Sequence, residues 1–337
     1  MRRLRSSLGP VLAASLMAAL VATAPAGSQT LPPSSPAMAT DLAEQSGGST
    51  VLEGLEIVGR PLGPAMWRAT MGDSEVIILG SVTPIHHQQK WDDGRLRRSL
   101  TGARLLLTPV EGKMGVGGVA AFLARDAFRV RTFRGDLEKD IPPDLRERVV
   151  ETRRQAKTKA DRYAKWKPAV AGALLLSDFR AAQGVSEAKP ASQVEDIARA
   201  MKVPVKPMAE LPISALMKAA GDLNQAQQIN CLRAFLNQIT FEGARPGELG
   251  KAWAVGDLAG VRRNYPAQAY ESCLGQVGGG QALRERAVAE STATLLQALR
   301  TPGKTVAIID LAQMQRRNGV LDRLQAAGAQ ITVPLDG

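Results

Sequence analysis

The sequence predicts an α/β fold, in an α+β arrangement where segments near both ends of the chain form one mixed central sheet around a large helical insertion. Two observations predict it. Short apolar runs bounded by turn residues occur early in the 337-residue chain and again near its end. Between about residues 142 and 299, nearly every segment has the spacing of amphipathic helices. The length and the 45% of hydrophobic residues suffice for one large domain or two small ones. Because strands at both ends enclose the helical middle, we expect a single domain over residues 51–337.

The first 50 residues precede this domain. Three arginines lead into an apolar run from about Leu8 to Ala24, and Ala24-Pro25-Ala26 offers a small-x-small cleavage site. This is the layout of a secretory signal peptide over residues 1–26, with an uncleaved membrane anchor as the alternative. Residues 27–50 are rich in Pro, Ser, Ala and Gly and are expected to be a flexible linker. No later segment reaches the ~18 apolar residues of a membrane span, so none is expected after signal cleavage.

The early strands follow in order. Residues 55–59 (LEIVG) and 65–70 (AMWRAT) have strand character, and Gly72-Asp73 marks a turn. Residues 75–80 (EVIILG) then pair back as the second arm of a hairpin. Residues 93–103 have helical spacing, and residues 104–110 (RLLLTPV) form a buried strand that ends at Pro109.

The middle of the chain is predicted to be helical. Residues 144–166 are strongly charged with one apolar stripe, as in a single exposed helix, whereas residues 167–183 are apolar, as in a core helix. Residues 213–239 form either one long helix or two helices broken near Gly221. The other expected elements are a helix and strand over 192–205, helices over 247–266 and 282–300, and a flexible loop over 275–281.

The end of the chain returns to α/β character. Residues 304–310 (KTVAIID) form a strand, and residues 318–328 form an amphipathic helix that stops at Gly328. Residues 329–335 close the sheet.

Charge and cysteines restrict the class of protein. The net charge is +11, yet the positive residues are scattered, so we expect a solvated basic surface and no nucleic-acid partner. An anionic membrane face or an acidic glycan would be a more fitting partner for an exported chain. The two cysteines, Cys231 and Cys273, indicate a disulfide, with two free buried thiols as the alternative.

Several catalytic motifs are absent or incomplete. Gly303-Lys304-Thr305 opens a strand and has no glycine five residues earlier, so it is not a phosphate-binding loop. The sequence has no GxSxG or HExxH motif. The only histidines, His86 and His87, are adjacent, and successive side chains of an extended segment point to opposite sides. We therefore interpret them as loop residues rather than as a pair of metal ligands.

A set of ordered segments resembles the TraB/GumN family, whose animal relatives include the Tiki metalloproteases. The resemblance spans about residues 65 to 335. The segments that carry it are MWRATMGDSEVIILGSV, ARLLLTP, WKPAVAGALL, AWAVGDLAGV and TVAIIDLAQMQRRNGVLDRLQAAGAQITVP. The resemblance implies a divalent metal held by two GxxH motifs and an acidic residue, with a helical Arg-Asn pair nearby.

This chain departs from the family pattern at each implied ligand. The first motif reads Gly80-Ser81-Val82-Thr83, so Thr83 occupies a histidine position, and the acidic position falls on Thr108. In the second motif Asp310 replaces the glycine and Gln313 the histidine. Arg286 matches the helical arginine, but Ala287 stands where asparagine is usual.

Uncharged threonine and glutamine bind divalent ions far more weakly than imidazole and carboxylate. We therefore expect no metal and no other cofactor, although His86 with Glu111 or Asp310 offers one possible rescue. The residues expected to persist as a binding site are listed here: Gly80, Ser81, Thr83, Thr108, Arg286, Asp310 and Gln313.

The predicted function is that of an exported, periplasmic or secreted bacterial envelope protein. We expect it to bind an envelope peptide or glycan and to be non-catalytic or only weakly active. The alternatives are an active metal-dependent hydrolase that uses unrecognised ligands, and a structural partner in an envelope complex. The sequence does not define the ligand or the oligomeric state.

Overall fold

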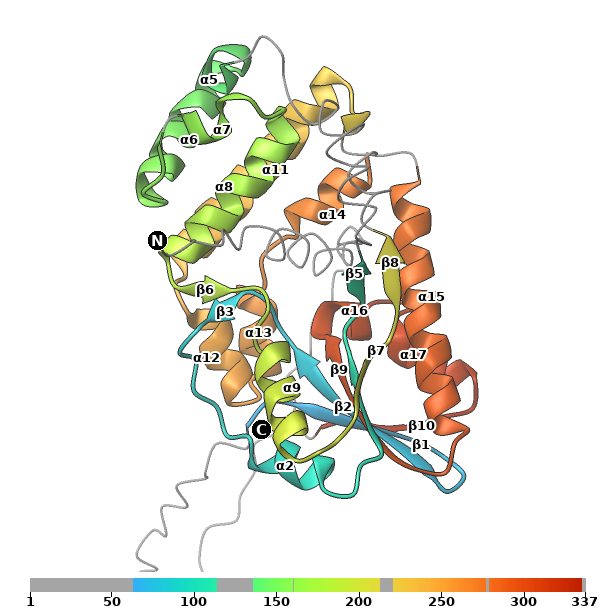
Figure 1. Ribbon diagram of the computed structural model, residues 1–337. Coiled ribbons are helices and arrows are strands. Elements are labelled where there is room, and N and C mark those ends of the chain that lie inside the picture. The colour runs from blue at the N-terminus through green and yellow to red at the C-terminus, as the bar shows by residue number, and fades with distance from the viewer. Residues whose placement is uncertain (1–62, 114–135, 160, 213–220, 277–278, 335–337) are drawn as a thin grey trace, which may run out of the picture.

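The computed structural model describes residues 63–113, 136–159, 161–212, 221–276 and 279–334. It confirms the mixed α/β fold: a six-stranded sheet carries helices on both faces, and a helical layer lies beyond one end of the sheet (Figure 1). The signal peptide, the linker and the expected strand at 55–59 lie outside the described residues.

The central sheet has the strand order β10-β1-β2-β9-β4-β7. The pairs β2–β9, β9–β4 and β4–β7 are parallel, while β1 is antiparallel to both β2 and β10. The strands span β1 Met66–Met71, β2 Ser74–Ser81, β4 Leu105–Thr108, β7 Val205–Pro207, β9 Gly303–Asp310 and β10 Gln330–Thr332. Two short pairs lie apart from it: β3 (Ile85–His86) with β6 (Val185–Ser186), and β5 (Glu111–Lys113) with β8 (Glu210–Pro212).

The predicted hairpin and closing strands are confirmed. Strands β1 and β2 pair through the turn at Gly72, whose φ of 55° lies in the left-handed region that glycine tolerates. Strand β9 enters between β2 and β4, so the first and last thirds of the chain share one sheet.

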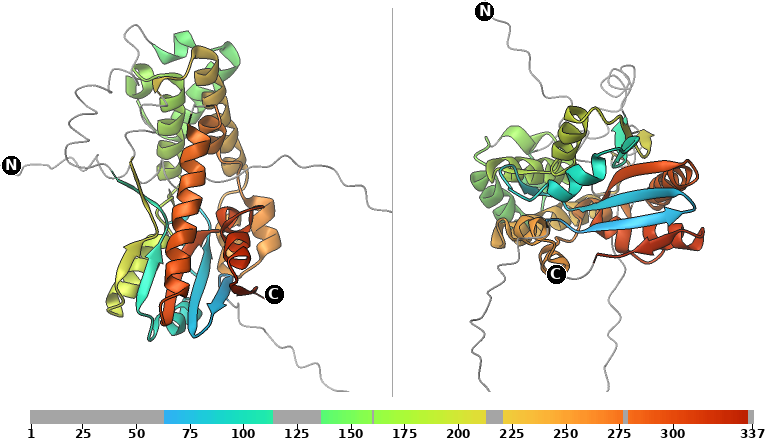
Figure 2. Two further views of the ribbon diagram at one scale, coloured as in Figure 1. Left: turned by 90° about the vertical axis from the view of Figure 1, so that its right-hand side faces the viewer. Right: turned by 90° about the horizontal axis from the view of Figure 1, so that it is seen from below.

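Each face of the sheet is covered by its own helices (Figure 2). On one face, α2 (Gly94–Leu100) and α9 (Ala191–Ala200) pack on alternate residues such as Leu79 and Ile308. On the other face, α15 (Gly280–Leu299), α16 (Leu311–Gln315) and α17 (Val320–Ala326) cover Ile78 and Ile309. Alternate residues of each strand therefore belong to two separate cores, one on each face of the sheet.

The helical layer has a third core of its own. Its main helices are α5 (Leu137–Asp140), α6 (Pro143–Gln155), α7 (Asp161–Ala164), α8 (Pro168–Ala182), α11 (Gln225–Ala244) and α14 (Ala269–Leu274). Helices α12 (Glu248–Ala254) and α13 (Leu258–Asn264) link this layer to the sheet.

One predicted helix is wrong. Residues 144–166 form two helices, because the chain turns after α6 through Lys157, whose φ is 53°. The turn buries Tyr163, and the Tyr163 hydroxyl donates a 2.6 Å hydrogen bond to Asp178 in α8. An amphipathic stripe does not reveal such a break, since both halves keep one apolar face.

The first residues of two helices were not predicted from the sequence. Helix α11 begins after Gly221, with Asn224 and Gln227 forming a capping box. Residues 213–220 lie outside the described part, so the structure shows only this second half of the predicted segment. Helix α15 begins at Gly280, inside the segment expected to be a loop.

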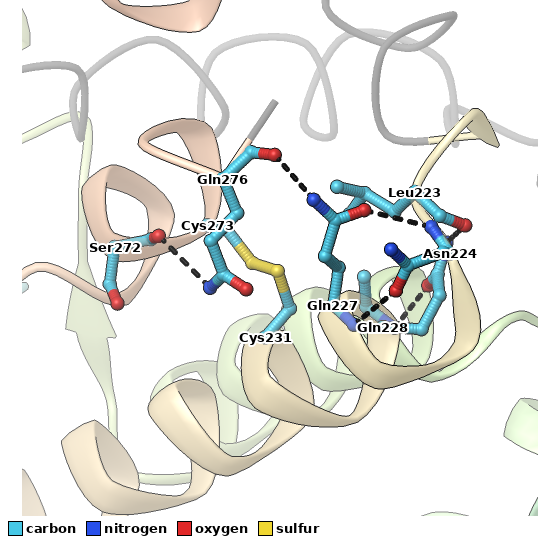
Figure 3. Close-up of a disulfide and its surroundings, with 9 residues drawn as sticks. Leu223, Asn224, Gln227, Gln228, Cys231, Ser272, Cys273 and Gln276 are labelled. Atoms are coloured by element: carbon cyan, nitrogen blue, oxygen red, sulfur yellow. Dashed lines mark hydrogen bonds between the residues drawn. A yellow bond between two sulfur atoms is a disulfide. The ribbon is translucent and has the colours of Figure 1, made fainter. Parts of the chain in front are cut away.

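The predicted disulfide is confirmed. Cys231 in α11 and Cys273 in α14 are bonded, and their Cα atoms lie 5.0 Å apart (Figure 3). Beside the bond, the Gln227 side chain donates a 2.8 Å hydrogen bond to the carbonyl of Gln276, which ties α11 to the turn after α14 (Figure 3).

Candidate functional site

The carboxyl ends of three neighbouring parallel strands meet at one edge of the sheet. Ser81, the last residue of β2, lies opposite Asp310, the last residue of β9. Strand β4 ends at Thr108 on the other side of β9. In parallel α/β sheets, this edge is where ligands and catalytic groups gather. The structure therefore brings four predicted site residues, Gly80, Ser81, Thr108 and Asp310, to the expected place.

Gly80 is fixed by close packing. The Trp253 indole nitrogen donates a 2.7 Å hydrogen bond to the Gly80 carbonyl, and both residues are buried. A Cβ atom added at Gly80 would lie 2.6 Å from a methyl carbon of Leu311 and 2.7 Å from the Trp67 ring. Only glycine fits here, because any side chain would push the sheet away from the helix that follows β9.

The Asp310 carboxylate is occupied by protein donors. One oxygen accepts hydrogen bonds from the backbone N–H groups of Ala312 at 2.9 Å and Gln313 at 3.1 Å, which caps α16. The other accepts a 2.5 Å hydrogen bond from the Tyr265 hydroxyl. Burial raises the pKa of Asp310, while these three hydrogen bonds oppose the rise. Burial and the neighbouring Asp310 raise the pKa of Tyr265 well above its ordinary value.

A second carboxyl group, Glu271 of α14, lies within electrostatic range of Asp310. Glu271 is only 3% exposed, and none of the described residues forms a hydrogen bond with either of its oxygens. Burial raises its pKa to about 8, and the nearby guanidinium groups of Arg316 and Arg284 moderate the rise. A buried carboxyl group without partners is costly, so its position calls for a physical reason.

Sequence reasoning missed both Glu271 and Tyr265. Glu271 lies in a short helix that was not predicted, two residues before Cys273, and Tyr265 lies just after α13. The proximity of Glu271 to a paired cysteine was the only sequence signal, and it points to burial rather than to chemistry.

The remaining carboxyl-edge residues are mostly enclosed. Ser81, Thr108 and Gln313 are buried, and the Thr108 hydroxyl forms no hydrogen bond with any described residue. Thr83 is partly exposed and precedes a cis peptide bond to Pro84.

Three predicted residues lie away from this group. Arg286 projects from α15 with 60% of its side chain exposed and pairs with Glu290, so the structure does not bring it to the edge. Glu111 is exposed on β5, opposite Glu210 of β8. His86 pairs with Val185 in the β3–β6 ladder, and its Nδ1 accepts a 3.2 Å hydrogen bond from the Gln88 backbone N–H.

His86 lines a large open cleft of about 1160 Å³ between the helical layer and the sheet. Its walls come from α6 and the end of α11 on one side, and from β3, the segment after it and α12 on the other. Pro84 and Pro266 line the same cleft, and they are the chain neighbours of Thr83 and Tyr265. The cleft therefore opens beside the carboxyl edge.

The sequence model of the TraB/PrgY/gumN family matches residues 65–333, from the first strand of the sheet to the last. The chain belongs to this family. Searches of curated proteins and of solved structures find no match to the chain.

The described residues do not fit the divalent metal that the TraB/GumN resemblance implies. The histidine and acidic positions of the family carry Thr83, Gln313 and Thr108, and His86 lies on the separate β3–β6 ladder. Asp310 is engaged by three protein donors. Across the part of the chain that the structure describes, no three His, Cys, Asp or Glu residues are grouped so as to hold an ion. In this TraB/PrgY/gumN member, the carboxyl edge of the sheet carries hydroxyl, amide and buried carboxyl groups.

Proposed function

We propose that this chain is an exported cell-envelope member of the TraB/PrgY/gumN family that binds an envelope peptide or glycan without metal-dependent catalysis. The proposal depends mainly on the hydrogen bonds that Asp310 accepts from other residues of the chain. This side chain caps a helix and holds Tyr265, so its lone pairs serve the fold rather than an ion.

Export is supported by two features. The N-terminal sequence has the three-part layout of a signal peptide. The disulfide between Cys231 and Cys273 suits an oxidising compartment. In addition, none of the described helices is both long and apolar enough to cross a membrane.

Binding is supported by the cleft beside the carboxyl edge. Pockets that hold ligands typically have volumes of roughly 300–1,000 Å³. The cleft, at about 1160 Å³, has room for a ligand at least that large. Its lining combines apolar side chains, which can pack against a ligand, with amide and charged groups, which can bind its polar atoms.

A second candidate function, an active hydrolase, is favoured by Glu271. A buried carboxyl group with two unpartnered oxygens would suit a general acid or a ligand of a bound cation. Such a mechanism would use residues outside the family motifs.

Metal analysis of the purified full chain tests the proposal. Cells would be grown with added Mn, Co and Zn, and the bound metal would be counted by mass spectrometry. We expect far less than one ion per chain. One ion per chain that is lost in Glu271→Gln or His86→Ala, but kept in Asp196→Asn, an exposed carboxylate outside the cleft, would support the hydrolase instead.

A further inference from the structure

The cleft between the helical layer and the sheet has an apolar base. Ile85, Phe179, Ile239 and Leu249 line it, and each is less than 9% exposed. They come from four separate elements, so the base is held rigidly by the cores of both layers. Such a base can accept apolar side chains of a ligand.

Free amide groups lie above this base. Gln88 and Gln183 line the cleft and are exposed, and neither side chain makes a hydrogen bond to another described residue. Each offers one carbonyl acceptor and two N–H donors. This matches the alternating donors and acceptors of a peptide backbone.

The charges in the cleft are unbalanced. Lys90, Arg148 and Arg245 line it, and none forms an ion pair with a carboxylate of the described chain. Arg245 lies over the Phe241 ring at 4.3 Å, and the one described side chain that accepts a hydrogen bond from Arg148 is Thr240, at 3.3 Å.

The acidic residues of the cleft are mostly neutralised elsewhere. Glu242 is bound by the buried Arg180, and Glu151 is bound by Arg154. Glu147 is the one lining carboxylate for which the described residues provide no ion pair. The cleft is therefore left with an excess of positive charge.

Arg148 is the most informative of the cations. It is half-buried on α6, and burial together with the nearby Arg233 lowers its pKa. Asp144, whose charge acts on Arg148, is held by Arg233 at 2.8 Å. A partly desolvated guanidinium without a carboxylate gains most from a ligand that supplies one.

The geometry points to a binding site for an extended acidic peptide in this cleft, with Arg148, Lys90 and Arg245 holding its carboxylates. The cations project from three elements, α6, the segment after β3 and the end of α11, rather than from one. Such spacing suits several carboxylates along a chain better than a single phosphate. A glycan commonly stacks on open aromatic faces, but here Phe179 is buried and Phe241 is covered by Arg245.

This inference rests on the proposed function, whose ligand class it narrows from peptide or glycan to acidic peptide. It would be tested with the purified full chain by fluorescence anisotropy. The probes are a labelled peptide of alternating Leu and Glu, the same peptide with Gln for Glu, and a labelled acidic oligosaccharide. We expect the Glu peptide to bind at least about 10-fold more tightly than the Gln peptide, and less tightly as salt rises.

Variants locate the site. Arg148→Gln should weaken binding of the Glu peptide about 10-fold. Arg146→Gln removes an exposed arginine of the same helix outside the cleft, and should change binding by less than about twofold. Lys90→Gln, in an exposed loop, provides a second variant if Arg148→Gln fails to fold by circular dichroism.

Equal binding of the two peptides, tighter binding of the oligosaccharide, or unchanged binding in both cleft variants would overturn the acidic-peptide site. Metal counts on the same preparations separate this failure from failure of the proposed function. A chain that contains no metal and binds no peptide would refute the peptide site in the cleft but not the proposed function. A chain that contains metal and binds the peptide would refute the proposed absence of metal-dependent catalysis but not the peptide site.

Discussion

Glu271→Gln is the substitution that reports most directly on the carboxyl edge. Glu271 is buried and forms no hydrogen bond with the residues that the structure describes, and burial raises its pKa from 4.5 to about 8. Asp310 adds to this rise, and Arg284 and Arg316 oppose it. Glutamine has nearly the same shape and cannot ionise, so it mimics the protonated form.

The sign of the effect follows from proton binding. Below pH 4.5 the carboxyl group is protonated in both the folded and the unfolded chain, so it does not affect the pH dependence. Between pH 4.5 and pH 8 the unfolded chain releases the proton while the folded chain keeps it. The free energy of unfolding therefore falls by about 1.4 kcal/mol per pH unit in this window, to a total of about 5 kcal/mol above pH 8.

Urea unfolding followed by circular dichroism, at pH values on both sides of this window, measures the difference. Glu271→Gln should match the wild type in acid and exceed its unfolding free energy by up to about 5 kcal/mol above pH 8. Glu147→Gln, which removes one exposed carboxylate, is measured in parallel as the control. If Glu271→Gln is instead less stable than the wild type above pH 8 and matches it only in acid, the carboxylate is ionised and held by a cation in the folded chain, and the reasoning is refuted.

Three further predictions concern the frame of the site and are checked by urea unfolding. Replacing both Cys231 and Cys273 with serine opens a loop with a sequence separation of 42 and should cost about 4 kcal/mol; an unchanged midpoint would mean that the bond does not form in solution. Gly80→Ala should cost about 2 kcal/mol, because the new methyl group overlaps Leu311, and a neutral result would show that this helix is free to shift. Trp253→Phe should cost about 2 kcal/mol by removing the donor to the Gly80 carbonyl, and a loss below about 0.5 kcal/mol would contradict that role.

The sheet end of the site could be predicted from the sequence. The apolar runs ending at Ser81, Thr108 and Asp310 identify three strand ends, and parallel pairing then brings those ends to one edge. Local periodicity contains this information because strands bury alternate residues.

The rest of the site depends on tertiary packing that periodicity does not encode. Tyr265 is 45 residues from Asp310 in sequence, and only the fold joins them. The orientation of α15 about its axis places Ala287 in the core and Arg286 at the surface, although the two residues are neighbours in the sequence. The cleft forms where the helical layer meets the sheet, so the sequence of no single segment predicts it.

The central claim is that the carboxyl edge has exchanged metal ligands for uncharged groups. Calorimetric titration of Mn, Co and Zn into the purified wild type and into a variant with Thr83→His and Gln313→His tests it most directly. We predict no measurable binding to the wild type and a new site in the variant. Binding of one ion per wild-type chain that disappears in Asp310→Asn or Glu271→Gln would contradict the account.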